Sequence, residues 1–137
     1  VCDGVTMFFM HLEDIARLND PPERVYAWVK PPSPKNFKAR FSRFIEGIAV
    51  YDLERGPCFN DALYWTAHTG VFTDALITKP LHPHEKPASL IERLLRLHGK
   101  TGTVLDPFAG SGSVAKVATD VFGWDSVNIE IKPGWWL

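Results

Sequence analysis

Residues 104–122 read VLDPFAGSGSVAKVATDVF, and this stretch decides the fold of the chain. The β-branched and aliphatic residues from Thr103 to Leu105 predict a short strand. A Gly-containing loop follows, and a helix is predicted from about Ser113, because apolar residues then recur at helical spacing. The apolar face of this helix comprises Val114, Val117, Ala118, Val121 and Phe122. The stretch therefore predicts a strand, a Gly-rich loop and a helix in direct succession.

A second helix is predicted before this stretch, and a second strand after it. Pro87 suits the first helical position, and Gly99 is a natural stop. Between them the apolar face comprises Leu90, Ile91, Leu94, Leu95 and His98. Ser126 to Ile131 is predicted to form the strand. This order of elements indicates an α/β fold with mostly parallel strands, whose ligand binds at the carboxyl ends of those strands.

The N-terminal half of the chain has weaker signals. Strands are expected at Val5 to Met10, Val25 to Val29, Ile45 to Tyr51 and Leu63 to Thr66. Leu12 to Leu18 is predicted to form two helical turns, which end at the Asn-Asp-Pro-Pro sequence of residues 19–22. The Pro-rich and basic stretch from Lys30 to Arg43 is expected to form an exposed loop.

The composition excludes several classes of protein. The 137 residues are 45% hydrophobic and 23% charged, which is typical of one globular domain. Fifteen Lys and Arg against sixteen Asp and Glu give a formal net charge of -1, so any contact with nucleic acid must use a local patch. Val5 to Met10 is the longest apolar run and is too short to cross a bilayer. We therefore expect no membrane span and a cytoplasmic location.

The Gly-rich loop is interpreted as a cofactor site. Glycines between a strand and a helix let backbone N–H groups approach a ligand closely. Glu130 follows Gly112 by 18 residues at the end of the next predicted strand, where a carboxylate can accept hydrogen bonds from ribose hydroxyls. Residues 110–115 also fit a dinucleotide fingerprint, so NAD is an alternative. Asp106 favours S-adenosylmethionine instead, because it would repel a pyrophosphate but could hold the ammonium of an amino-acid moiety.

Four segments resemble the amino-group DNA methyltransferases. They are residues 84–87 (HEKP), 90–93 (LIER), 104–113 (VLDPFAGSGS) and 128–131 (NIEI). The resemblance is to members in which the catalytic segment precedes the cofactor segment. It is specific over residues 84–131, the cofactor-binding half, and looser over residues 5–51, which resemble part of the catalytic, target-facing half. Residues 1–137 are expected to form a single methyltransferase-like domain with a Rossmann-like fold that lacks part of the usual fold.

The resemblance implies the activity and the partners. Members transfer the methyl group of S-adenosylmethionine to the exocyclic amino group of adenine or cytosine, on double-stranded DNA with a flipped target base. A homodimer is compatible with the resemblance. A remnant that binds cofactor or DNA without catalysis is one alternative, and an NAD-dependent oxidoreductase is another.

The resemblance also assigns the cofactor residues. It implies that the backbone of Phe108, Ala109, Gly110, Ser111, Gly112 and Ser113 holds the methionine part, and that Asp106 holds its ammonium. It implies that Glu130 holds the ribose, and that Lys86 and Pro87 belong to the helix start that closes over the cofactor. The alternative for Lys86 is a solvated lysine in the first helical turn.

The catalytic motif of the family, [DNS]-P-P-[YFW], is not intact in this sequence. Asp20, Pro21 and Pro22 supply its first elements, but Glu23 stands where an aromatic ring should stack on the base. The position is also wrong, because these residues follow the strand at Val5 to Met10 instead of preceding it. A turn is the preferred interpretation, since Asn, Asp and Pro are common turn residues. The catalytic residues therefore stay unassigned.

One local basic patch is a candidate for contact with DNA. From Arg24 to Ile45 there are six Lys or Arg and no acidic residue. Lys35, Lys38, Arg40 and Arg43 alternate with phenylalanines, so cations could neutralise phosphates while the rings stack on unpaired bases. The alternative is a solvated loop anchored by its phenylalanines. The histidines show no metal-ligand spacing with Cys or acidic partners, and we expect no metal.

Overall fold

The fold is given by a computed structural model, which describes residues 4–31, 44–52, 69–98, 102–132 and 134, with only the backbone at position 98. These residues belong to two compact units, Val1–Ala75 and Leu76–Leu137. Each predicted half, 5–51 and 84–131, falls within one unit. That both form a single domain stays a prediction. The strand expected at Leu63 to Thr66, and residues 32–43 of the expected loop, lie outside the described residues.

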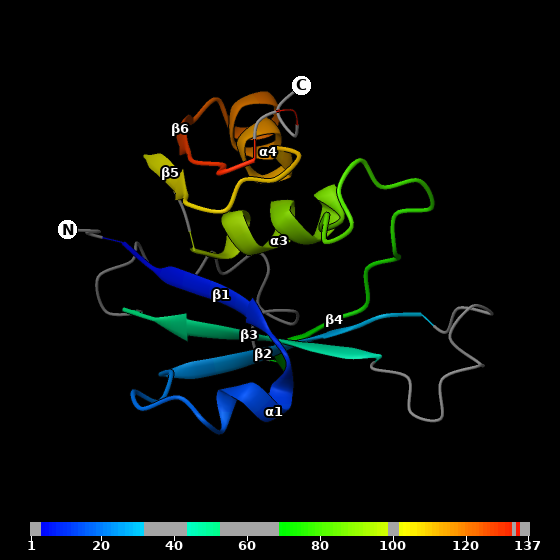
Figure 1. Cartoon of the computed structure of the whole chain (residues 1–137). Helices are drawn as coiled ribbons and strands as arrows, with labels where there is room; N and C mark the ends of the chain where they lie inside the picture. The colour runs from blue at the N-terminus through cyan, green and yellow to red at the C-terminus, as the bar shows by residue number, and fades with distance from the viewer. Residues whose placement is uncertain (1–3, 32–43, 53–68, 99–101, 133, 135–137) are drawn as a thin grey trace. The chain divides into compact units, whose positions relative to one another are not determined.

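The first unit is built on a mixed sheet with the strand order β1-β3-β2-β4 (Figure 1). Its elements are β1 (Thr6–Met10), α1 (Leu12–Ile15), β2 (Arg24–Val29), β3 (Ile45–Tyr51) and β4 (Val71–Phe72). β3 pairs antiparallel with both β1 and β2, whereas β2 pairs parallel with β4. The buried core of this unit comprises Tyr26, Trp28, Ile48, Ala49, Val50 and Phe72.

Helix α1 packs closely on β3 at Gly47. A Cβ atom at Gly47 would lie 2.5 Å from Cδ1 of Ile15 and 3.0 Å from Cδ2 of Leu12. The missing side chain therefore makes room for α1. The helix is shorter than predicted, because Arg17 and Leu18 donate to the carbonyls of Asp14 and Ile15 three residues back, in the tighter pattern of a 3₁₀ turn.

The second unit contains α3 (Ala88–His98), β5 (Thr103–Asp106), α4 (Ser113–Phe122) and β6 (Asp125–Asn128). β5 and β6 pair parallel, with Asp106 opposite Asn128. Helix α4 packs on both strands, and α3 packs on α4 (Figure 1). The buried core comprises Leu90, Ile91, Leu94, Leu95, Leu97, Ala109, Val117 and Ala118. The leucines and the isoleucine of the apolar face predicted for α3 are thus in the core. The side chain of His98, the last residue of that face, is not among those described.

The predicted α/β class is confirmed, but the strand directions differ from the expectation in the first unit. The pair β5–β6 is parallel as predicted, and β2 pairs parallel with β4, a strand that the sequence did not predict. The pairs β1–β3 and β2–β3 are antiparallel, so the sheet is not mostly parallel. Antiparallel neighbours need no long crossover connection. Strand β6 is also shorter than predicted and ends at Asn128, two residues before Glu130 turns back toward the Gly-rich loop.

Candidate functional site

The Gly-rich loop joins β5 to α4 in the second unit. β5 ends at Asp106 and α4 begins at Ser113, as the sequence predicted. Gly110 and Gly112 have φ values of 52° and 74°, in the left-handed region that side chains disfavour by roughly 1–2 kcal/mol. Gly112 caps α4 without a side-chain hydrogen bond, so the N-terminus of this helix has no side-chain acceptor at its cap.

Asp106 lies at the start of the loop with its carboxylate partly withdrawn from water. Its Oδ1 accepts the backbone N–H of Phe108 at 3.1 Å. Burial raises the pKa of Asp106, the hydrogen bond from Phe108 lowers it, and the negative charge of Glu130 raises it, so that the net pKa lies above the usual range of an aspartate. A cation bound near both carboxylates would relieve this repulsion.

Glu130 lies on the other side of the loop and is held by backbone donors. Its Oε1 accepts the N–H of Lys132 at 2.9 Å, and its Oε2 accepts the N–H of Gly110 at 2.8 Å. The hydrogen bonds from Lys132 and Gly110 lower the pKa of Glu130, partial burial raises it, and a charge on His82 lowers it further, with a net lowering. Glu130 is therefore a carboxylate fixed by backbone donors, which keeps acceptor capacity for a ligand hydroxyl.

The backbone between the two carboxylates is also tied together. The N–H of Ile129 donates to the carbonyl of Asp106 at 2.9 Å, and the N–H of Ala109 donates to the carbonyl of Ile129 at 2.9 Å. Ala109, Gly110 and Gly112 are buried, and Ser111 and Ser113 are half-buried. Phe108 is 82% exposed at the rim. The structure thus brings the predicted loop residues, Asp106 and Glu130 together.

Lys86 and Pro87 stand at the entrance to α3. The carbonyl of Pro87 accepts the N–H of Ile91 at 3.1 Å, so this proline precedes the helix by one residue instead of opening it. Pro87 is buried and Lys86 is half-buried. The role of these two residues toward a cofactor stays a prediction.

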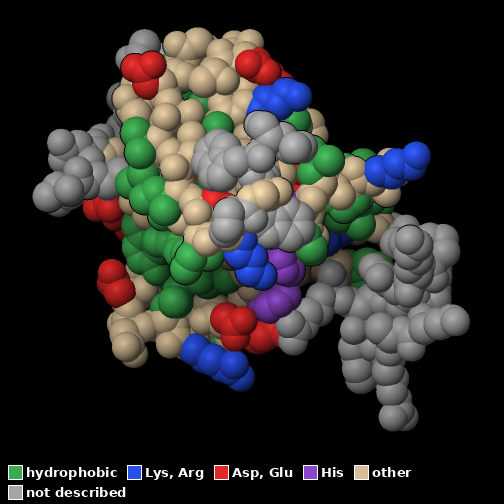
Figure 2. All heavy atoms as spheres, turned by 45° about the horizontal axis from the view of Figure 1, so that its top comes forward, with side chains coloured by type: hydrophobic (Ala, Val, Ile, Leu, Met, Phe, Trp, Pro, Cys, Tyr) green, Lys and Arg blue, Asp and Glu red, His purple; other side chains and the backbone are tan. Residues whose placement is uncertain are grey.

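His82 is a residue of this site that the sequence did not reveal. A Cβ atom at Gly110 would lie 3.4 Å from both Cγ and Nδ1 of His82, so the imidazole covers the bare face of that glycine. Histidine side chains, purple in Figure 2, gather on one face with acidic and basic ones, and the rings of His82 and His84 lie 5.9 Å apart. The signal was its position, two residues before the segment 84–87 that carries the resemblance.

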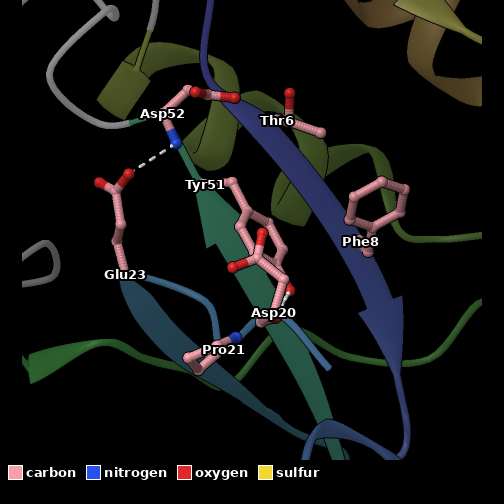
Figure 3. Close-up of a pocket in the computed structure, with 7 residues that line it drawn as sticks. All are labelled: Thr6, Phe8, Asp20, Pro21, Glu23, Tyr51 and Asp52. Atoms are coloured by element: carbon pink, nitrogen blue, oxygen red, sulfur yellow. Dashed lines mark hydrogen bonds between the residues drawn. The ribbon is translucent and has the colours of Figure 1, made fainter. Parts of the chain in front are cut away.

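Asp20 and Pro21 line a pocket of about 400 Å³ in the first unit (Figure 3). The other lining residues are Thr6, Phe8, Glu23, Tyr51 and Asp52. The hydroxyl of Tyr51 donates to the backbone carbonyl of Asp20 at 2.8 Å, which fits the interpretation of this segment as a turn. Pro22 is half-buried beside the pocket lining. A catalytic role for Asp20, Pro21 and Pro22 stays a prediction.

The remaining predicted site residues, Lys35, Lys38, Arg40 and Arg43, lie outside the described residues. Within the described part of the chain, no three or more His, Cys, Asp and Glu side chains are grouped so that they could hold a metal ion. The described helices also include none with the length and hydropathy that a membrane span requires.

Three solved structures share this fold at low sequence identity. The M1.HpyAVI complex with S-adenosylmethionine has a TM-score of 0.70 at 20% identity, over 97% of this chain and 70% of that one. A putative DNA modification methylase from Thermus thermophilus, complexed with S-adenosyl-L-methionine, has a TM-score of 0.67 at 20% identity, over 98% and 66%. The cytosine-N4-specific PvuII DNA methyltransferase has a TM-score of 0.65 at 17% identity, over 82% and 47%. The chain thus spans between about half and 70% of these proteins.

The sequence model of a family described as DNA methylase, of the N6/N4 type, matches residues 23–134. This match covers most of the chain and includes the Gly-rich loop, Asp106 and Glu130. It confirms the resemblance to amino-group DNA methyltransferases and the adenosylmethionine-dependent methyltransferase fold, and it disfavours the NAD-dependent alternative. The chain belongs to the N6/N4 DNA methylase family.

Proposed function

We propose that the second unit binds S-adenosylmethionine, and that the protein uses it to methylate an exocyclic amino group of adenine or cytosine in DNA. The observation that carries the proposal is the pair of carboxylates, Asp106 and Glu130, that frames the Gly-rich loop. Their electrostatic environments differ, because burial and repulsion raise the pKa of Asp106 whereas backbone donors lower the pKa of Glu130. One side of the loop therefore suits a cation and the other suits neutral hydroxyls.

The residues present fit an amino acid linked to a nucleoside. Asp106 offers a carboxylate oxygen to an ammonium group, whose charge would favour the ionised form of that side chain. The N-terminus of α4, which lacks a side-chain cap at Gly112, offers backbone N–H groups and a favourable dipole to a carboxylate. Glu130, fixed by Gly110 and Lys132, offers its remaining lone pairs to ribose hydroxyls.

S-adenosylmethionine, when bound, supplies an electrophilic methyl group on a positively charged sulfur. The protein then has to orient the acceptor amine and to accept its protons, because direct attack by the amino nitrogen needs no covalent enzyme intermediate. The proposed substrate is double-stranded DNA with its target base flipped out. Lys35, Lys38, Arg40 and Arg43 are proposed to neutralise its phosphates.

The cofactor proposal is tested by calorimetric titration with S-adenosylmethionine and, separately, with NAD. We expect saturable binding of S-adenosylmethionine alone, and at least tenfold weaker binding by Asp106→Asn. The matched control is Asp120→Asn, which removes the same charge from an exposed position on α4 and should bind like the wild type. No binding by the wild type, or equal loss in both variants, would overturn the proposed role of Asp106.

The transfer step is tested with radiolabelled S-adenosylmethionine and duplex DNA. Label in DNA, and its position on adenine or cytosine after digestion, would establish the reaction and the target base. Asp20→Ala then tests the incomplete motif, with Asp14→Ala as the control on α1. Cofactor binding without transfer would favour the alternative, a remnant that binds without catalysis.

A further inference from the structure

The turn that carries His82 is closed by side chains of its own residues. Oε2 of Glu85 accepts the N–H of Leu81 at 2.6 Å and the N–H of His82 at 3.4 Å. The N–H of Glu85 donates in return to the carbonyl of His82 at 3.0 Å. The backbone from Leu81 to Glu85 therefore has a fixed shape, which sets where the side chain of His82 can point.

The imidazole of His82 is itself held by this turn. Its Nδ1 accepts the backbone N–H of His84 at 3.2 Å. Because Nδ1 is the acceptor, a neutral His82 carries its proton on Nε2. Both the rotation of the ring and its tautomer are thus set by His84, whose own side chain is exposed and takes no part in this bond.

The held ring lies against the loop at the point where the loop meets Glu130. The ring atoms Cγ, Nδ1 and Cδ2 lie 3.4, 3.4 and 3.6 Å from where a Cβ of Gly110 would be. The N–H of Gly110 is the donor that fixes Oε2 of Glu130 at 2.8 Å. The three residues form one contact chain from the turn, through the loop, to the carboxylate.

We propose that His82 is a positioning residue that packs beside Gly110, limits the movement of the loop there and so keeps the Gly110–Glu130 hydrogen bond aligned for the cofactor. This inference rests on the proposed function, because it concerns the carboxylate assigned there to the ribose. In this proposal the turn at residues 81–85 fixes the position of a planar ring beside Gly110, where the loop has no side chain of its own.

Three substitutions separate the parts of this role. Asn at position 82 keeps heavy atoms in the places of Cγ, Nδ1 and Cδ2 and keeps an acceptor for His84. Leu keeps the shape of those atoms but has no acceptor, and Ala removes both. We expect His82→Asn to bind S-adenosylmethionine within about threefold of the wild type, His82→Leu to bind less tightly, and His82→Ala to bind about tenfold less tightly. His84→Ala is the matched control and should bind like the wild type, because it keeps the backbone N–H.

A double-mutant cycle tests whether the effect passes through Glu130. In a Glu130→Ala background the hydrogen bond to Gly110 is gone, so adding His82→Ala should weaken binding no further. If the fold-loss of affinity in the double variant equals the product of the two single-variant losses, His82 acts independently of Glu130. That result would overturn the proposal. Wild-type affinity in the single variant His82→Ala would overturn it as well.

Hydrogen exchange of the Gly110 amide gives a readout that needs no cofactor. We expect exchange at least tenfold faster in His82→Ala than in the wild type, and unchanged exchange in His82→Asn and His84→Ala. If the wild type fails to bind S-adenosylmethionine, the proposed function falls, and this amide still decides the inference about His82. Equal protection of Gly110 in wild type and His82→Ala would contradict it.

Discussion

The N–H of Gly110 donates a 2.8 Å hydrogen bond to Oε2 of Glu130, which lies 20 residues further along the chain. This bond joins the loop after β5 to the segment after β6, two neighbouring parallel strands. The position of the carboxylate and the path of the loop are therefore not independent. A change at either residue should disturb both, and this coupling makes the site testable by single substitutions.

Gly110→Ala should lower both stability and cofactor affinity. At φ of 52° an alanine is strained by roughly 1 kcal/mol, so the loop backbone that carries the N–H of Gly110 should shift, although its methyl group would make only ordinary van der Waals contact with the imidazole of His82. The control is Gly123→Ala, which has a similar φ of 65° but no atom within 4 Å of the new Cβ. Thermal unfolding should show similar losses in both, whereas calorimetry should show weaker binding of S-adenosylmethionine in Gly110→Ala alone. Equal affinities would contradict the coupling.

Asp106→Asn should stabilise the fold at neutral pH while it weakens binding. The pKa of Asp106 is raised in the folded protein, so the folded state binds a proton more tightly than the unfolded state does. The ionised form of Asp106 therefore lowers the free energy of unfolding. This loss of stability develops as the pH rises from the ordinary pKa of an aspartate through the raised pKa of the folded state. Asn removes this loss and can still accept the N–H of Phe108.

The pH dependence of the melting temperature checks the sign of this effect. The gain from Asp106→Asn should be greatest at neutral pH and should vanish below about pH 4, the ordinary range of an aspartate. Asp120→Asn, on an exposed part of α4, should show no such dependence. A variant less stable than the wild type at pH 7 would show that the carboxylate of Asp106 supports the fold.

The sequence predicted the cofactor loop well because its signals are local. Glycines between an aliphatic strand and an amphipathic helix are typical of a ligand-binding turn, and the spacing from Gly112 to Glu130 follows from the length of one helix and one strand. Strand direction in the first unit was not predictable in this way, because residue preferences for β structure do not encode it. Strand β4, with the two residues Val71 and Phe72, is too short to show any period.

The contact of His82 with Gly110 depends on tertiary structure. The two residues are 28 positions apart, and a histidine in a proline-containing turn has no residue pattern that indicates its partner. For the Asp20-Pro21 segment, by contrast, a residue pattern was present in the sequence, but it did not indicate the contacts that the segment makes. Its composition matched part of a motif, yet the backbone of Asp20 accepts from Tyr51 and the segment belongs to the other unit from Asp106.

Lys30→Met should destabilise the first unit by about 2 kcal/mol, because it removes one charged partner of a largely buried carboxylate. Nζ of Lys30 lies 2.7 Å from Oε2 of Glu46, and their side chains are 23% and 11% exposed. Met keeps an apolar side chain of similar length but also removes the cation–π contact of Lys30 Nζ, which lies 4.9 Å from the centroid of the Trp28 ring. Denaturant unfolding measures the loss.

The control for Lys30→Met is Arg17→Met, which breaks an ion pair with Asp14 whose side chains are 77% and 47% exposed. It should cost less than about 0.5 kcal/mol. The double variant Lys30→Met, Glu46→Leu should recover part of the loss, since it also removes the buried carboxylate that Lys30 pairs with. A small effect of Lys30→Met alone would show that other contacts satisfy Glu46.

Replacing Lys38, Arg40 and Arg43 together by Ser should weaken DNA binding and make it less sensitive to salt. If each cation neutralises one phosphate, the slope of log K against log salt should become less steep by about 3, because each released counterion contributes about 0.9. Fluorescence anisotropy with a labelled duplex at several salt concentrations measures this slope. The control replaces Arg17, Lys79 and Lys116, three exposed cations elsewhere, by Ser and removes the same net charge. An equal change of slope in both variants would mean that DNA responds to overall charge, and the segment would then be a solvated loop.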